Sequence, residues 1–165
     1  MIHPAAGPAW LVWVEGTAAA TAMRQWLWLY PIVEIVHILG FVVLVGAAAL
    51  FDLRLLGLAR HLPVTGLARY HLRWARFALV LIAPSGLLMF AAHATEMAVN
   101  PAFQAKLALI ALAGVNAAVF HRSVFRSVAS WDRDVLAPGR ARLAAVLSLL
   151  LWSGVIACGR LLAYL

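Results

Sequence analysis

The chain has 165 residues, of which 65% are hydrophobic and 12% charged, and its mean hydropathy is +0.95. This balance lies far from that of a soluble domain and indicates a membrane protein. The formal net charge of +7 comes from arginines gathered in two blocks between apolar segments. That arrangement is typical of an orientation signal in a multi-span membrane protein, so we exclude nucleic acid as a partner.

The N-terminal part predicts a short helix followed by a membrane span. Residues 8–25 combine Trp10 and Trp13 with Glu15 and Arg24, a pattern that favours an amphipathic helix lying in the membrane interface. The first span is predicted over 26–52, which is long enough to cross a bilayer.

Three further spans follow, separated by a basic loop, a tight turn and a second basic loop. The segment from Leu53 to Arg76 is expected to be largely a loop, and the second span is predicted over 74–98, with a bend at Pro84. Asn100 and Pro101 predict a turn. The third and fourth spans are predicted over 102–122 and 142–165.

The charge distribution predicts the orientation of these spans. Ten of the thirteen Lys and Arg residues fall in the two basic loops, and only Arg24, Lys106 and Arg160 fall elsewhere. Since basic loops stay on the cytoplasmic side, both termini are expected on the outer, periplasmic side. The fold class is therefore all-α: a single domain, residues 1–165, built as a four-transmembrane-helix bundle with an N-terminal interfacial helix.

Ionisable side chains of all four spans are expected at one level near the outer boundary. At 1.5 Å of rise per residue, each lies within roughly 4 to 10 Å of the outer end of its span. Such groups are costly in hydrocarbon and mark functional sites. They are Glu34 and His37 in the first span, His93 and Glu96 in the second, Lys106 in the third and Arg160 in the fourth.

Three interpretations of this cluster stay open. His37 and His93 would be the axial ligands of a b-type haem, with Gly40 and Gly86 giving room and Lys106, Arg160 or Arg24 pairing with its propionates. Alternatively, His37, His93, Glu34 and Glu96 would bind a transition metal such as copper. In the third interpretation no cofactor is bound: Glu34 pairs with Arg160, Glu96 pairs with Lys106, and the histidines form structural hydrogen bonds.

A second pair of histidines, His71 and His121, lies near the inner ends of the second and third spans. They are candidates for a second haem site, or they are interfacial residues beside arginines that attract anionic lipid. Asp52 is expected to pair with a nearby arginine or to stabilise the loop. The sequence has no paired nucleophile and base and no phosphate-binding loop, so nothing in it favours a hydrolase or a transferase.

Several motifs carry a family resemblance. They are WLYPIVEIVHILG (28–40), FDLRLLG (51–57), NPAFQAK (100–106) and VFHR (119–122). With these, the whole chain resembles a family of small bacterial inner-membrane proteins catalogued as a domain of unknown function, and Glu34, His37 and His121 match its pattern. The resemblance implies a four-helix protein of the bacterial inner membrane and assigns no activity. More loosely, the architecture is similar to four-helix cytochromes b and to the membrane domain of copper-resistance proteins.

The leading prediction is a b-type cytochrome-like electron-transfer protein that binds haem b. The alternatives are a cofactor-free subunit or scaffold of a larger membrane complex, and a protein that handles copper or another transition metal. Besides the lipid bilayer, the expected partners are a quinone or a redox protein, a second copy of the chain, or a larger membrane complex.

Overall fold

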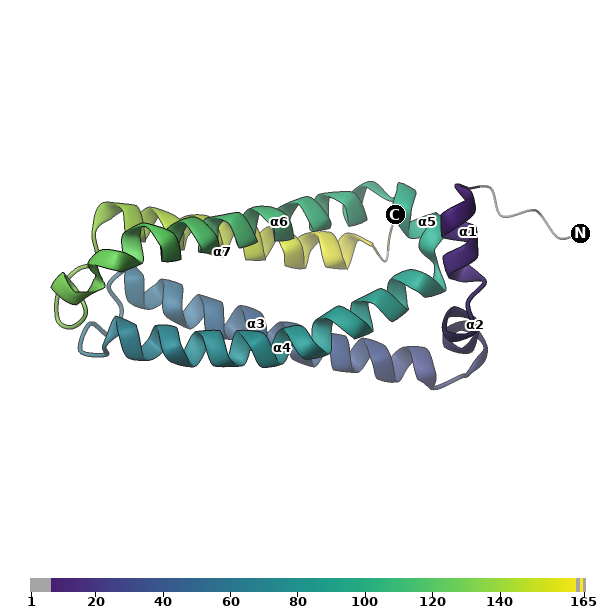
Figure 1. Ribbon diagram of the computed structural model, residues 1–165, viewed down its shortest axis with the longest axis horizontal. Coiled ribbons are helices and arrows are strands. Elements are labelled where there is room, and N and C mark those ends of the chain that lie inside the picture. The colour runs from purple at the N-terminus through teal and green to yellow at the C-terminus, as the bar shows by residue number, and fades with distance from the viewer. Residues whose placement is uncertain (1–6, 163, 165) are drawn as a thin grey trace, which may run out of the picture.

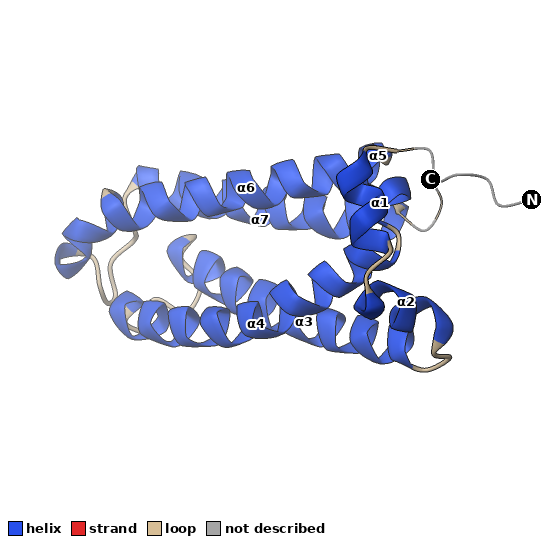
Figure 2. Cartoon of the chain, turned by 45° about the vertical axis from the view of Figure 1, so that its right-hand side comes forward, coloured by secondary structure: helices blue, strands red, loops and turns tan. Residues whose placement is uncertain are grey.

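The structure, a computed structural model, describes residues 7–162 and 164. Four long helices run side by side through the molecule (Figure 1): α3 (Leu29–Leu55), α4 (Val64–Ala92), α6 (Pro101–Arg122) and α7 (Gly139–Leu161). Each is long and apolar enough to cross a membrane, which confirms the four expected spans. The rest of the described chain is short helices and loops, with no strand (Figure 2). The protein is therefore an all-helical, multi-pass membrane protein.

The four long helices form two hairpins. α3 packs along α4, α6 packs along α7, and the hairpins meet where α3 lies against α7. The rings of Phe41 on α3 and Trp152 on α7 touch edge to face, with centroids 5.9 Å apart. Phe90 of α4 stacks on Phe103 of α6 at 5.5 Å. Aromatic contacts thus join the two hairpins, α3 to α7 and α4 to α6.

One end of the bundle, here called the capped end, is covered by α1 (Ala9–Glu15), α2 (Ala18–Gln25) and α5 (Ala94–Val99) (Figure 1). The single helix predicted over 8–25 is two helices, because the chain turns at Gly16 and Thr17 and the Thr17 hydroxyl accepts a hydrogen bond from the Ala20 amide (3.3 Å), capping α2.

Two charged side chains hold this cap on the bundle. The Arg24 guanidinium donates to the carbonyls of Ala92 (2.9 Å) and Glu15 (2.8 Å). The Glu15 carboxylate accepts from the amide and the hydroxyl of Thr95, at 2.7 and 2.8 Å. Both contacts fall where α4 gives way to α5, so the N-terminal helices are fixed to that junction.

The second long helix differs from its prediction at both ends. α4 begins at Val64, so ten residues expected in a basic loop are helical, and it ends at Ala92, where His93 (φ −142°, ψ 46°) separates it from α5. The early start depends on a contact with a distant part of the chain, because the Asp132 carboxylate accepts from the Thr65 amide (2.8 Å) in the first turn. α4 continues through Pro84 and tilts away from α3 beyond it (Figure 1).

The opposite end, here called the loop end, contains residues 56–63, the 3-10 helix η1 (Val124–Ser130) and the turn that leads into α7. α7 begins at Gly139, three residues before the predicted fourth span, and residues 163 and 165 of that span lie outside the described residues. A buried cluster fills the loop end and forms the main hydrophobic core. It consists of Phe51, Leu55, Val64, Ala68, Phe120, Trp131, Ala137, Ala141 and Ala145.

Candidate functional site

His37 lies inside the α3–α4 hairpin, in its capped-end half. Its Nδ1 is 3.0 Å from the Ser85 hydroxyl, and a Cβ atom built on Gly86 would stand 3.0 Å from the His37 ring. Gly86 is therefore the residue that lets the imidazole pack flat against α4. Gly40 serves the hairpin in the same way, since a Cβ there would meet Ile82 at 2.9 Å.

The hydrogen bonds of Ser85 fix the tautomer of His37. Ser85 Oγ lies 2.5 Å from the carbonyl oxygen of Leu81, a separation that requires the hydroxyl proton between the two oxygens. Because a hydroxyl has one proton, Ser85 accepts the bond to His37 Nδ1. Neutral His37 therefore carries its proton on Nδ1, and its lone pair is on Nε2, as in a metal-ligating histidine.

Lys106 of α6 enters the bundle at a similar level. It lies close enough to His37 for the two charges to interact, and near Cys158 of α7. A Cβ built on Gly159 would be 3.8 Å from the lysine Nζ, an ordinary van der Waals distance, so the ammonium group lies beside this glycine. Among the described residues no carboxylate lies within ion-pair distance of Lys106. The bundle thus places a histidine lone pair and an unpaired cation on the same level.

His93 lies elsewhere. It occupies the α4–α5 junction, with its side chain 47% exposed, and contacts Tyr30 edge-on at a centroid distance of 6.1 Å. His93 follows Gly86 by seven residues, and Tyr30 precedes His37 by seven, so the two histidines are separated by roughly 10 Å along the hairpin. His37 and His93 are not brought onto one iron by this arrangement.

The other ionisable residues that were predicted near the outer boundary are also exposed at the protein surface. The Glu96 carboxylate approaches His93 Nδ1 at 4.0 Å and is 83% exposed, while Glu34 is exposed on α3. Arg160 is exposed on α7, donates to the Tyr164 hydroxyl and stacks over that ring at 4.7 Å. The pairs Glu34–Arg160 and Glu96–Lys106 do not form in the described part of the chain.

His71 and His121 lie in an aromatic cluster at the loop end. Phe51 stacks on His71 with an interplanar angle of 10° and contacts Phe120 edge to face, and Phe120 in turn contacts His121. Phe125 completes the set by packing on His121 at 5.3 Å. Rings separate the two imidazoles, so they are linked by packing and are not paired directly.

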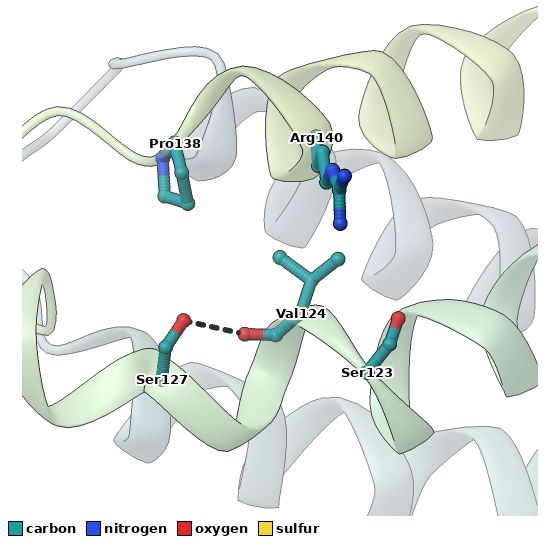
Figure 3. Close-up of a pocket in the computed structure, with 5 residues that line it drawn as sticks. All are labelled: Ser123, Val124, Ser127, Pro138 and Arg140. Carbon is teal, nitrogen blue, oxygen red and sulfur yellow. Dashed lines mark hydrogen bonds between the residues drawn. The ribbon is translucent and has the colours of Figure 1, made fainter.

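Two cavities of about 240 Å³ lie in the loop-end half. One is lined by Ser123, Val124, Ser127, Pro138 and Arg140, between η1 and the start of α7 (Figure 3). Its hydroxyls already donate to carbonyls, Ser127 to Val124 and Ser123 to Val119. The other lies between α3 and α4 and includes His71.

Two polar residues that the sequence interpretation did not assign, Ser85 and Arg54, are central to this structure. Ser85 orients His37. Arg54 is 2% exposed and donates to the carbonyls of Leu62, Arg60 and Asp132. The only sequence signal for it was the FDLRLLG motif. Asp52 does not pair with Arg54 as expected, since Asp52 Oδ2 and an Arg54 nitrogen are both buried without a partner.

The donor set limits what these sites can bind. Within residues 7–162 and 164, no group of three or more His, Cys, Asp or Glu side chains is placed to hold a metal ion. His37 is thus a single imidazole hydrogen-bonded to a serine, with a lysine cation nearby. That combination suits a cofactor that brings most of its own ligands and carries negative charge.

Comparison with curated proteins and with solved structures found no match. A family pattern matches residues 11–165, a range that includes all four long helices, His37, Ser85, Arg54 and Lys106. This confirms the resemblance to an uncharacterised family. The chain belongs to the Family of unknown function (DUF6644).

Proposed function

We propose that this protein is a b-type cytochrome-like electron-transfer protein in which His37 holds a haem iron in the capped-end half of the bundle. The observation that carries the proposal is the bond between Ser85 and His37. It keeps the proton on Nδ1 and leaves the Nε2 lone pair for the metal. Bound haem would supply one-electron redox chemistry.

Lys106 is the second part of the proposal. An unpaired ammonium group inside a membrane bundle is costly unless an anion neutralises it. A haem propionate is such an anion, and the lysine Nζ lies beside Gly159 of α7. Lys106 would hold the propionate edge, and His37 would hold the iron.

Of the residues predicted to bind haem, the proposal retains only His37 and Lys106. Gly40 and Gly86 do not give a macrocycle room between α3 and α4, because Ile82 and the His37 ring occupy the space next to them. His93 is exposed at the α4–α5 junction, roughly 10 Å from His37 along the hairpin, and Arg160 is exposed on α7. The proposal therefore assigns one axial ligand, His37, and no role in haem binding to His93, Arg160, Glu34 or Glu96.

The test is a reduced-minus-oxidised absorption spectrum of protein purified from a haem-replete host. We expect a Soret and an alpha band that are lost in His37→Ala and kept in His93→Ala, with haem retention reduced in Lys106→Met. Loss of both bands in His93→Ala as well as in His37→Ala would support haem ligation by both histidines. A colourless, well-folded wild-type protein would overturn the proposal.

A cofactor-free membrane subunit or scaffold is the second candidate. This candidate is favoured because several polar side chains form hydrogen bonds that stabilise the fold. Arg24 and Glu15 hold the short helices at the capped end, and Arg54 and Asp132 hold the loop end together. This candidate predicts colourless protein with a partner that co-purifies in mild detergent. Copper handling has less support, because it needs the metal cluster not found among the described residues; bound metal in elemental analysis would revive it.

The proposal places the protein in a bacterial inner membrane with the capped end periplasmic and the loop end cytoplasmic. The support is the arginine distribution, since ten of the thirteen basic residues belong to the loop end and the helix ends next to it. Exposed Trp10, Trp13, Trp26 and Trp28 at the capped end suit an interfacial level.

A further inference from the structure

The cavity between α3 and α4 opens toward the lipid-facing side of the bundle. Leu50 and Tyr70 on its rim are 68% and 65% exposed, and Trp74 is 41% exposed. All three belong to helices long and apolar enough to span a membrane. A ligand would therefore reach this cavity from the bilayer. Its walls are Val43, Ala47, Leu50 and Phe51 of α3, and Leu67, Tyr70, His71 and Trp74 of α4.

His71 is the one ionisable base in this apolar lining, and the backbone of Ala47, another lining residue, is the polar group next to its imidazole. Its Nδ1 is buried. The ring nitrogen left for a ligand in the cavity is therefore Nε2. Against apolar walls, such a polar atom favours a hydrogen-bond partner over none. The imidazole N–H can donate to an acceptor carried by a ligand.

The aromatic lining of the cavity favours a flat ring. Phe51 lies parallel to the His71 imidazole at 5.7 Å, and Phe120 fixes Phe51 from behind at 5.8 Å. Tyr70 and Trp74 add two further aromatic side chains to the lining. A volume of about 240 Å³ is below the roughly 300 to 1,000 Å³ of ordinary ligand sites. It suits a small ring system whose tail stays in the lipid.

We propose that this cavity binds the ring of a membrane quinone, with the His71 imidazole donating a hydrogen bond to a ring carbonyl. A quinone combines the three required properties: a planar ring, a carbonyl acceptor and entry from the bilayer. A phospholipid ester offers a carbonyl without a flat ring, so it leaves the aromatic walls unexplained. This binding site does not depend on haem at His37, and either proposal can fail alone.

The experiment is a binding titration of the full-length protein in phosphatidylcholine nanodiscs. The probe is decylubiquinone, and quenching of tryptophan fluorescence reports binding, since Trp74 lines the cavity. We expect saturable quenching, weakened about tenfold or more in His71→Phe, which keeps a ring but loses the donor. His71→Gln restores an N–H donor and should recover part of the affinity.

Three controls separate the alternatives. Ala47→Phe fills the cavity and should abolish saturable quenching. Gly114→Leu on α6 should leave it unchanged, because a Cβ there meets nothing within 4 Å. Decylbenzene, which lacks carbonyls, should bind weakly and equally to wild type and His71→Phe. Each variant is first checked for a single size-exclusion peak and a wild-type melting temperature.

Two results would overturn the proposal. Equal affinity of wild type and His71→Phe for decylubiquinone would show that the cavity is a plain apolar crevice. Displacement of decylubiquinone by phosphatidylglycerol, together with loss of bound phospholipid in His71→Phe, would assign the imidazole to a lipid ester. A haem spectrum that stays unchanged in His71→Phe keeps this result distinct from the test on His37.

Discussion

Single side chains fix the backbone at both ends of this bundle, and Arg54 shows how. Its guanidinium is buried where α3 reaches the loop end and donates to three carbonyls from two separate loops: Leu62 (2.8 Å), Arg60 (3.0 Å) and Asp132 (3.1 Å). No carboxylate neutralises it directly in the described residues. Arg54 therefore acts as a multiple hydrogen-bond donor that fastens the loops together, a geometry that only the planar guanidinium provides.

Replacement of Arg54 should destabilise the fold strongly. Arg54→Met removes the donors, so the Leu62 carbonyl loses its partner and the Arg60 and Asp132 carbonyls each keep only a backbone bond, and we expect the free energy of unfolding to fall by about 3 kcal/mol. Equilibrium unfolding in mixed detergent micelles would measure the change. Arg73→Met, at an exposed position of α4, serves as the matched control and should stay within about 0.5 kcal/mol of wild type. Equal stability of the two variants would contradict the role assigned to Arg54.

At the residue scale, the sequence identified part of the candidate site. His37 and Lys106 stood out because ionisable groups are rare inside apolar spans. His93 and Glu96 stood out for the same reason, yet they lie at a helix junction where side chains are exposed. Spacing along one helix cannot report rotation about its axis, so the sequence did not separate the interior residues from the exposed ones.

At the scale of elements, the short helices at the capped end depend most on tertiary contacts. α1 and α2 are too short to be stable alone in water, and they depend on their contacts with the bundle. Leu11, Ala20 and Met23 are buried there. The Glu15 carboxylate connects α1 to the backbone of α5 through Thr95. This bond joins segments eighty residues apart in the chain.

Breaking that bond should loosen the cap and leave the long helices intact. We expect Glu15→Ala to raise amide hydrogen exchange in residues 9–25 and in α5, because the Thr95 amide loses its acceptor. Exchange in α6 and α7 should not change. Glu34→Ala is the control, since Glu34 is exposed on α3 and makes no hydrogen bond to the described residues. Unchanged exchange in the cap of Glu15→Ala would show that apolar packing alone holds it.

At the scale of the whole molecule, the prediction concerns orientation. The natural cysteine is first removed by Cys158→Ser, and single cysteines are then introduced by Gly16→Cys at the capped end and Ser130→Cys at the loop end. In intact cells, a membrane-impermeant maleimide should label the Gly16 variant. It should label the Ser130 variant only after permeabilisation, because basic loops stay in the cytoplasm. The reverse pattern would show that the loop end faces outward.

The sequence by itself determined the number of spans, the all-helical class and the family. Those properties follow from long apolar runs, since a membrane admits helices as the structure for such segments. It also indicated that Pro84 would disturb the second span. It did not determine where α4 begins, because the Asp132 carboxylate that caps the first turn comes from the loop before α7.

Only the tertiary structure decided which polar groups meet. Ser85 is four residues from Leu81 and forty-eight from His37, and the pairing of α3 with α4 brings all three together. Likewise, the cavity that includes His71 is lined by residues of two helices, such as Phe51 of α3 and Trp74 of α4. It therefore forms only when α3 packs against α4. Contacts between helices depend on their rotation and depth, which side-chain packing fixes and local sequence does not. Fold class was therefore readable from the chain alone, and the candidate sites required the packed bundle.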